Sequence, residues 1–459
     1  MTPAGSPADA GAGRLWFLVA VQAAALWGMA WGGSGTPWPA IPLWVVAFAA
    51  YLGAVRHAAA PHRAGSIRRH AWTAGIALRA GVFPAAPTLS EDIYRYIWDG
   101  WVQSNGVNPY AHPPSASALE ELRTAWWPLI NHADVPTIYP PGAQVVFALL
   151  AAAGPAWWIF KLGWLAADLL VARLIDRLSS GRSVVPLLLW LWSPLVIVEV
   201  AWSGHLDPLG VAPMLGAVAL AGSAAVPAWR SGALLGLGGA LKFAPLAALP
   251  ALFRLRGPWA LAAGVLVPLL LYAPYIGAGT ALFDGLRTYA DIWAFNGGLY
   301  RVVERLPGHP DLAKWIGASI VGAIALRAAL RRWPLERALL WTIGAALLLS
   351  PTLHPWYLLW VLPFACLSAN RGWLLFSGTV FLAYAGRDAY LATGAWPEPA
   401  WLVWLIHGPP LALLAWDGLG GRDGLRGRRG GRRGGSPQGL VRRERVARGE
   451  ERGEGEDGG

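Results

Sequence analysis

Acidic and basic side chains gather in one short stretch of an otherwise apolar chain, LSEDIYRYIWDGWVQSNGVNPYAHPP, from Leu89 to Pro114. Within it, nine residues hold Glu91, Asp92, Arg95 and Asp99, with aromatic residues on both sides. A carboxylate at the mouth of a cavity can serve as a general base, and a nearby cation can stabilise an anion. The stretch is therefore the first candidate for a catalytic site.

The spacing of these residues predicts a helix over Glu91–Gln103. One face of this helix is polar and carries Asp92, Arg95 or Tyr96, Asp99 and Gln103. A second face is apolar and carries Ile93, Ile97 and Trp101. Ser90 can cap the helix, and Glu91 and Asp92 suit its positive N-terminal end. The pattern also fits a purely structural amphipathic helix on the membrane surface, with an ion pair to Arg95.

Other polar residues lie at predicted helix ends or breaks. WSGHLDP places His205 and Asp207 at the end of an apolar run; without a third ligand this is a weak metal signal, and a polar turn explains it equally well. LHPWY places His354 where it could bind phosphate or sugar, or belong to an interfacial aromatic belt. Lys242 lies inside an apolar run, where phosphate is the natural partner of a lone cation. Asp168, between apolar neighbours, is predicted to make a polar contact between helices.

The elements that must position these residues are membrane helices. The 459 residues are 55% hydrophobic and 14% charged, whereas soluble domains carry about a quarter charged residues. Long apolar runs recur along the chain, and several are long enough to cross a bilayer core of about 30 Å, which needs roughly 20 residues. These runs are Leu15–Trp31, Ile41–Val55, Val184–Val200, Pro258–Ile276, Ala338–Leu349 with Tyr357–Ala369, and Trp373–Tyr384. The single cysteine, Cys366, excludes a disulfide within the chain.

Basic residues predict the orientation of these spans, because cytoplasmic loops are enriched in arginine. The arginine-rich segments are His57–His70, Arg173–Arg182, Arg331–Arg337 and the C-terminal tail. With these segments in the cytoplasm, both termini lie inside, and the loops at about 88–141 and 277–312 lie outside and face the same side. We expect an all-α, polytopic protein with roughly 11–13 spans and a long first external loop.

Composition divides the chain into a membrane domain, 1–416, and a tail, 417–459. The tail is rich in glycine and arginine and is predicted to be disordered and to lie near anionic lipid. The net charge of +11 is concentrated in loops and tail, so it does not indicate nucleic-acid binding.

Two apolar regions are predicted to break, one at Gly154-Pro155 and the other at Lys242. The region around Lys242 is predicted to enter the membrane and to return to the same side as two short helices.

Several motifs together resemble the GT-C class of integral-membrane glycosyltransferases, notably the bacterial mannosyltransferases that use polyprenyl-phosphate sugars. The motifs are SEDIYRYIWDGWVQSNGVNPYAHPP with PTIYPPGAQVVFALL, then SPLVIVEVAWSGHLDPLGVAPMLGAVAL, GALLGLGGALKFAPLAALP, WAFNGGLYRVVERL and SPTLHPWYLLWVLP. They span about Thr88 to Pro363 in the same order. Trp101 departs from the pattern, because the family is expected to have arginine after Asp-Gly at this point.

The resemblance implies an inverting transfer of a sugar, with mannose expected, onto a cell-envelope glycan or glycolipid on the external face of the bacterial cytoplasmic membrane. Asp92 is then expected to be the base, with Glu91 as the second choice. The groups expected around the donor phosphate and sugar are Arg95, His205, Asp207, Lys242 and His354. The acceptor is expected to meet Asp99, which could instead hold Arg95, together with Tyr94 and Asn296. We assign no metal and no cofactor, although some members of the class use a divalent metal.

Other classes of membrane protein remain alternatives at this point. A transporter or flippase of lipid-linked sugars should show internal repeats and paired charges at mid-membrane, whereas here the acids concentrate in external loops. A ligase or polymerase of lipid-linked oligosaccharides would also act on the external face. A scaffold subunit without activity would account for the departure at Trp101.

Overall fold

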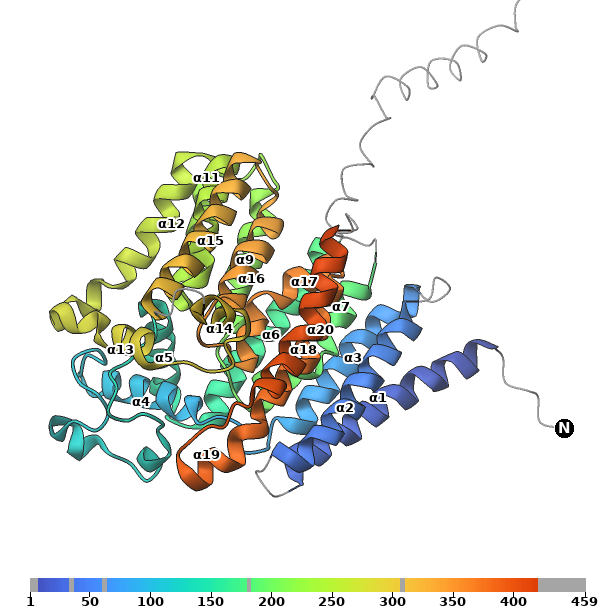
Figure 1. Ribbon diagram of the computed structural model, residues 1–459, viewed down its shortest axis with the longest axis horizontal. Helices are drawn as coiled ribbons and strands as arrows, with labels where there is room; N and C mark the ends of the chain where they lie inside the picture. The colour runs from blue at the N-terminus through green and yellow to red at the C-terminus, as the bar shows by residue number, and fades with distance from the viewer. Residues whose placement is uncertain (1–6, 33–36, 60–63, 180–182, 306–309, 420–459) are drawn as a thin grey trace, which may run out of the picture.

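The computed structural model describes residues 7–32, 37–59, 64–179, 183–305 and 310–419, and these residues are helical without any named β-strand (Figure 1). The all-α prediction is confirmed for this part of the chain. The predicted tail lies almost entirely outside the described residues, as do parts of the expected loops at 33–36, 60–63, 180–182 and 306–309.

Short turns and proline or glycine breaks divide the chain into many helices. The first half contains α1 (Pro7–Trp31), α2 (Pro37–Ala58), α3 (Ala64–Val82), α4 (Asp92–Ser104), η2 (Ser117–Leu122), η3 (Trp127–Leu129), α5 (Pro141–Ala153), α6 (Trp157–Ser179), α7 (Val185–Leu191), α8 (Pro194–Val196), η4 (Ile197–Trp202) and α9 (Pro208–Ala221). The predicted break at Gly154-Pro155 is confirmed, since it separates α5 from α6. Gly154 takes a φ of 153° there, a conformation that favours glycine.

The second half contains the elements that complete the cavity described below. They are α10 (Ala228–Leu241), η5 (Ala244–Ala248), α11 (Leu249–Arg256), α12 (Pro258–Leu271), η6 (Ala273–Phe283), α13 (Asp284–Ile292), α14 (Gly298–Arg305), α15 (Pro310–Leu330), α16 (Leu335–Leu348), η7 (Pro355–Trp360), α17 (Leu362–Ser368), α18 (Arg371–Thr379), η8 (Val380–Gly386), α19 (Arg387–Thr393) and α20 (Ala400–Leu419).

The described residues contain four helices that are long and apolar enough to cross a membrane. They cover Gly13–Trp31, Ala40–Ala58, Val185–Trp202 and Asp311–Leu330. A fifth arises if Pro258–Leu271 and Ala273–Ile292 count as one broken span, but these two pieces bend by 84°. The apolar run Pro258–Ile276 is therefore not one straight helix, because the chain turns near Tyr272.

The predicted helix break at Lys242 is also present in the structure. Helix α10 ends at Leu241, and Lys242 takes an extended conformation before η5 and α11. Helix α11 returns towards the start of α10, since Arg256 donates to the carbonyl oxygens of Ser223 and Val226. The predicted division into short helices that fold back on each other is confirmed, and Lys242 lies at the turn between them.

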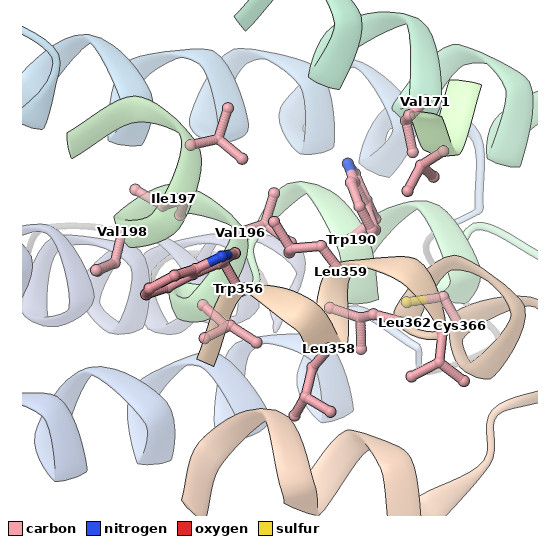
Figure 2. Close-up of a cluster of buried hydrophobic side chains, with 14 of the residues drawn as sticks. Val171, Trp190, Val196, Ile197, Val198, Trp356, Leu358, Leu359, Leu362 and Cys366 are labelled. Carbon is pink, nitrogen blue, oxygen red and sulfur yellow. The ribbon is translucent and has the colours of Figure 1, made fainter. Parts of the chain in front are cut away.

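One large apolar cluster joins the N-terminal and C-terminal parts of the chain. Figure 2 shows a portion of it, in which side chains of α7 to η4 meet side chains of η7 and α17. This packing brings the segment after His354 next to the segment that contains Glu199 and His205, although the two are far apart in sequence. At the scale of the whole chain, α4, α13 and α19 gather at one end, opposite α11 (Figure 1).

Asp168 makes the interhelical contact that its apolar surroundings predict. Its carboxylate accepts from Arg79 on α3, with Nη2 at 3.2 Å from Oδ1, and from Trp190 Nε1 on α7 at 2.7 Å. Arg79 and Asp168 are both fully buried. Because a buried charge needs a partner and hydrogen bonds, this cluster holds α3, α6 and α7 in register.

Candidate functional site

Helix α4 and segments from several other parts of the chain enclose a cavity of about 280 Å³. Aromatic rings form much of its wall, and charged groups enter it from several elements. The lining residues are Leu89, Ser90, Glu91, Asp92, Arg95, Asn131, His132, Val135, Pro136, Ile138, Tyr139, Lys242, Tyr289, Trp293, Ala294, Phe295, His354, Pro355, Trp356, Tyr357, Tyr384, Tyr390 and Trp396. Five of the ten predicted site residues line it, namely Glu91, Asp92, Arg95, Lys242 and His354.

Asp92 is the first residue of α4 and is half-buried at the cavity wall. One of its carboxylate oxygens accepts a hydrogen bond of 2.9 Å from the side-chain amide of Asn131. Ser90 Oγ accepts from the Asp92 backbone N–H at 3.2 Å, although Glu91 occupies the N-cap position. Asp92 thus keeps an oriented carboxylate with lone pairs left for a ligand, as a general base requires.

Helix α4 is amphipathic, as predicted, but the protein encloses it on both faces. Both the apolar face, with Ile93 and Ile97, and most of the polar face, with Tyr96 and Asp99, are buried. The reason is tertiary: α5 and the loop before it cover the polar face and supply hydrogen-bond partners.

Glu91 has a partner that the sequence analysis missed. Arg387, the first residue of α19, lies 3.2 Å from the Glu91 carboxylate, with its own side chain largely buried. The available signal was an Arg-Asp pair directly after the apolar run that ends at Tyr384. Because Glu91 is held in this ion pair while Asp92 has only a neutral partner, the geometry favours Asp92 over Glu91 as the base.

Arg95 is a cation whose charge reaches the cavity. Its Nε donates to Asp99 at 3.0 Å, while its buried Nη2 has no hydrogen-bond partner among the described residues. Asp99 is itself buried and also accepts from Thr137 Oγ1 and Gln144 Nε2, at 2.5 Å and 2.9 Å. The structure therefore supports the second role considered for Asp99, which is to hold Arg95. The free guanidinium edge is suited to an anion.

Lys242 enters the cavity from the break after α10, surrounded by aromatic rings. Its ammonium group lies 5.6 Å from the ring centre of Tyr139, 5.4 Å from that of Tyr357 and 5.2 Å from that of Trp360. Asp207 lies 3.6 Å from it and accepts from Trp360 Nε1. Asp207 is fully buried and does not line the cavity, so it fixes Lys242 instead of meeting a ligand.

His354 belongs to a column of stacked rings in the loop between α16 and η7. Its ring lies 4.8 Å from Phe295 and 4.4 Å from Trp356, which in turn lies 3.8 Å from His205. Burial among these rings lowers the pKa of His354 from 6.5 to about 3. His354 is therefore neutral near pH 7 and can offer a hydrogen bond to a sugar, but it supplies no positive charge to a phosphate.

Titration of His354 predicts a loss of stability on acidification. Its folded pKa lies below the unfolded value, so the unfolded chain binds the proton more readily as pH falls below about 6.5. We expect wild type to lose about 2 kcal/mol more than His354→Phe between pH 7 and pH 5. Thermal unfolding of both proteins at the two pH values measures this difference, and equal losses would contradict it.

His205 is not one of the residues that line the cavity but lies behind them. It is fully buried, and its Nδ1 lies 3.0 Å from a carboxylate oxygen of Glu199. Glu199 is a second residue that the sequence analysis missed; the signal was a lone acid inside the apolar run Val184–Val200. Its carboxylate also accepts from Tyr384 Oη, at 3.1 Å to each oxygen. Glu199 thereby links His205 to the cavity wall.

The remaining predicted residues lie away from the cavity lining. Tyr94 packs with Trp98 and Trp126 in a separate small apolar cluster. Asn296 is buried and ties neighbouring segments together, since its N–H donates to Glu398 Oε1 at 2.6 Å. Trp101 packs against the Tyr94 cluster and donates to the carbonyl oxygen of Leu122 at 3.0 Å, so this departure from the family pattern lies outside the cavity lining.

Comparison with protein families, with curated proteins and with solved structures finds no match for this chain. The cavity and its residues are therefore the basis for the function proposed below. Within the described residues, no group of three or more histidine, cysteine, aspartate or glutamate side chains is arranged to hold a metal ion.

Proposed function

We propose that this protein is a membrane glycosyltransferase that moves a sugar, with mannose favoured, from a polyprenyl-phosphate donor to a glycan or glycolipid acceptor of the cell envelope. In this proposal the chain crosses the bacterial cytoplasmic membrane roughly 11–13 times, with both termini inside and the cavity open to the outside. The location of α11, whose last turn carries Arg254 and Arg256, at the end opposite α4 supports this orientation.

One observation carries the proposal: a single aromatic cavity brings an oriented carboxylate, Asp92, together with two cations, Arg95 and Lys242. A sugar phosphate combines a ring, which packs on aromatic faces, with an anion, which binds cations. Asp92 and Arg95 come from α4, whereas Lys242 comes from the break after α10. A substrate in the cavity can therefore lie between the α4 side chains and Lys242.

The chemistry follows from the charges that develop in the reaction. An acceptor hydroxyl attacks the anomeric carbon of the donor from the side opposite the phosphate and gives its proton to Asp92. The bond between the anomeric carbon and the phosphate oxygen breaks, and polyprenyl phosphate leaves with one more negative charge than it had in the donor. Arg95 and Lys242 stabilise this growing charge, and preorganised cations at such a position lower the barrier.

Lys242 provides a direct test of the phosphate-binding part of the proposal. Lys242→Met removes a cation at the leaving group, so kcat/KM for the donor should fall by about 10²-fold. The double variant Lys242→Met/Asp207→Asn should show the same fall, which separates loss of the cation from the cost of an unpaired buried Asp207. Transfer of radiolabelled mannose from polyprenyl-phosphate-mannose to cell-envelope acceptors measures the effect.

Lys314 offers the matched control. The chain has three lysines, and Lys314 lies on α15, where it donates to the carbonyl oxygen of Ala290 outside the cavity lining. Lys314→Met should transfer like wild type. Full activity of Lys242→Met would remove Lys242 from the site, and the absence of transfer by wild type from any polyprenyl-phosphate sugar would contradict the enzyme and favour the transporter.

A further inference from the structure

Tyr384 is a wall residue of the cavity whose hydroxyl has a fixed direction. It lies on η8 and is almost fully buried. Its Oη donates towards both carboxylate oxygens of Glu199, each at 3.1 Å. A phenol has only one proton, and here that proton is taken by Glu199. What Tyr384 can still offer to the cavity is therefore a lone pair, which accepts a hydrogen bond and cannot donate one.

Glu199 is held rigidly enough to impose this direction. It is fully buried in η4, a π-helical turn in which the N–H of Ser203 bonds to the carbonyl oxygen of Val198 at 2.8 Å. Such turns often mark functional sites, because they insert a residue at a cost in regular helix. A carboxylate in so apolar a place persists only with hydrogen-bond partners. Among the described residues, Tyr384 and His205 supply these partners.

Aromatic packing on one face of the ring also holds His205 in place. Its ring stacks on Trp356 at 3.8 Å with an interplanar angle of 14°. Trp356 belongs to the same buried cluster as Val196 and Val198 (Figure 2). Nδ1 of His205 bonds to Glu199, at 3.0 Å from the carboxylate and 3.2 Å from the backbone carbonyl oxygen. The three side chains thus form one chain of contacts from the protein core to the cavity wall.

We propose that Tyr384 accepts a hydrogen bond from a hydroxyl of the ligand in the cavity, and that Glu199, oriented by His205, is the positioning residue that sets this polarity. The inference rests on the proposed function in one respect, since it takes the ligand to be a sugar. It adds to that site a residue that contacts the ligand, and it gives the direction of the hydrogen bond: the sugar hydroxyl next to Tyr384 donates and the Tyr384 oxygen accepts.

This polarity can be reversed by a single substitution. In Glu199→Gln the amide oxygen still accepts from His205, while the amide N–H₂ can donate to the Tyr384 oxygen. The phenolic proton is then free to turn into the cavity, so Tyr384 becomes a donor towards the ligand. A role of Glu199 in stability alone would not invert the hydrogen-bond preference of the cavity.

The test is equilibrium binding of polyprenyl-phosphate-mannose and of its monodeoxyfluoro analogues to the full-length protein in lipid nanodiscs. Fluorine replaces the hydroxyl at similar size but has no proton to donate. For wild type we expect one analogue to bind about fivefold more weakly than the parent donor. Tyr384→Phe should bind the parent about fivefold more weakly and show no further loss with that analogue, because the same contact is already absent. Glu199→Gln should abolish or reverse the penalty of that analogue.

Tyr51→Phe is the matched control. Tyr51 is also buried and donates to a backbone carbonyl oxygen, that of Leu189 at 2.9 Å, but it lies on α2 outside the cavity lining. It should reproduce any loss of thermal stability from removing a buried hydroxyl without changing the pattern of analogue binding.

The outcomes separate this inference from the proposed function. If wild type binds the parent donor but every analogue is penalised equally in wild type, Tyr384→Phe and Glu199→Gln, the inference is overturned and the proposed function stands. If wild type binds neither parent nor analogues, the proposed function fails and the inference fails with it.

Discussion

Asp92→Asn is expected to lower kcat for sugar transfer by about 10²–10⁴-fold, the range that a positioned general base contributes. Asparagine keeps the size of the side chain and can still bond to Asn131 after rotation of its amide, so the packing of α4 should persist. What it lacks is a basic oxygen to take the proton of the acceptor hydroxyl. Donor binding should therefore change little, whereas turnover should fall.

Comparison with two other acids makes this prediction specific. Glu91→Gln should cost less than tenfold, because Glu91 faces Arg387 in an ion pair and its loss affects only positioning. Asp134→Asn should have no effect, since Asp134 is exposed on the same loop as Asn131 and is not part of the lining. A larger loss in Glu91→Gln than in Asp92→Asn would reassign the base to Glu91.

Asp168→Ala is expected to cause the largest loss of stability, about 3–5 kcal/mol. The variant leaves Arg79 buried without its carboxylate partner and leaves Trp190 Nε1 without its acceptor. Both groups would then be desolvated without compensation, and an unpaired buried charge is the costliest of these defects. Chemical or thermal unfolding in detergent measures the change.

Two variants control for this interpretation. Asp311→Ala removes an exposed acid that lies 3.6 Å from Lys314, and surface pairs of this kind contribute at most about 1 kcal/mol. Arg79→Met/Asp168→Leu replaces the whole pair with apolar side chains and should recover much of the stability lost in Asp168→Ala. If Asp168→Ala unfolds like wild type, the pair does not hold the helices together.

Local features of the chain were predicted correctly because local physics determines them. Glycine and proline favour helix ends, and the chain breaks at Gly154-Pro155 and just before Pro245, next to Lys242. Helical spacing places α4 within a residue or two of its position. A lone acid between apolar neighbours must find a partner on another helix, as Asp168 does.

The division of roles among the site residues could not be predicted in this way. His205 and Asp207 belong to one motif with polar side chains, yet both are buried behind the wall, where they orient Tyr384, through Glu199, and Lys242. Arg387 lies 296 residues from Glu91 in sequence, and nothing in either segment indicates their pairing.

From the sequence alone follow the helical class, the presence of apolar helices long enough to cross a membrane, the helix breaks and the identity of α4 as the segment that carries the charged groups. These features depend on composition and on the spacing of residues a few positions apart, because the periodicity of a helix determines which of its residues share a face. Only the tertiary structure decides that α4 is buried on both faces, that Asp92 faces the cavity while Asp99 holds Arg95, and that Glu199 fixes Tyr384. Burial and pairing of charges depend on contacts between distant segments, and packing across the whole chain determines those contacts.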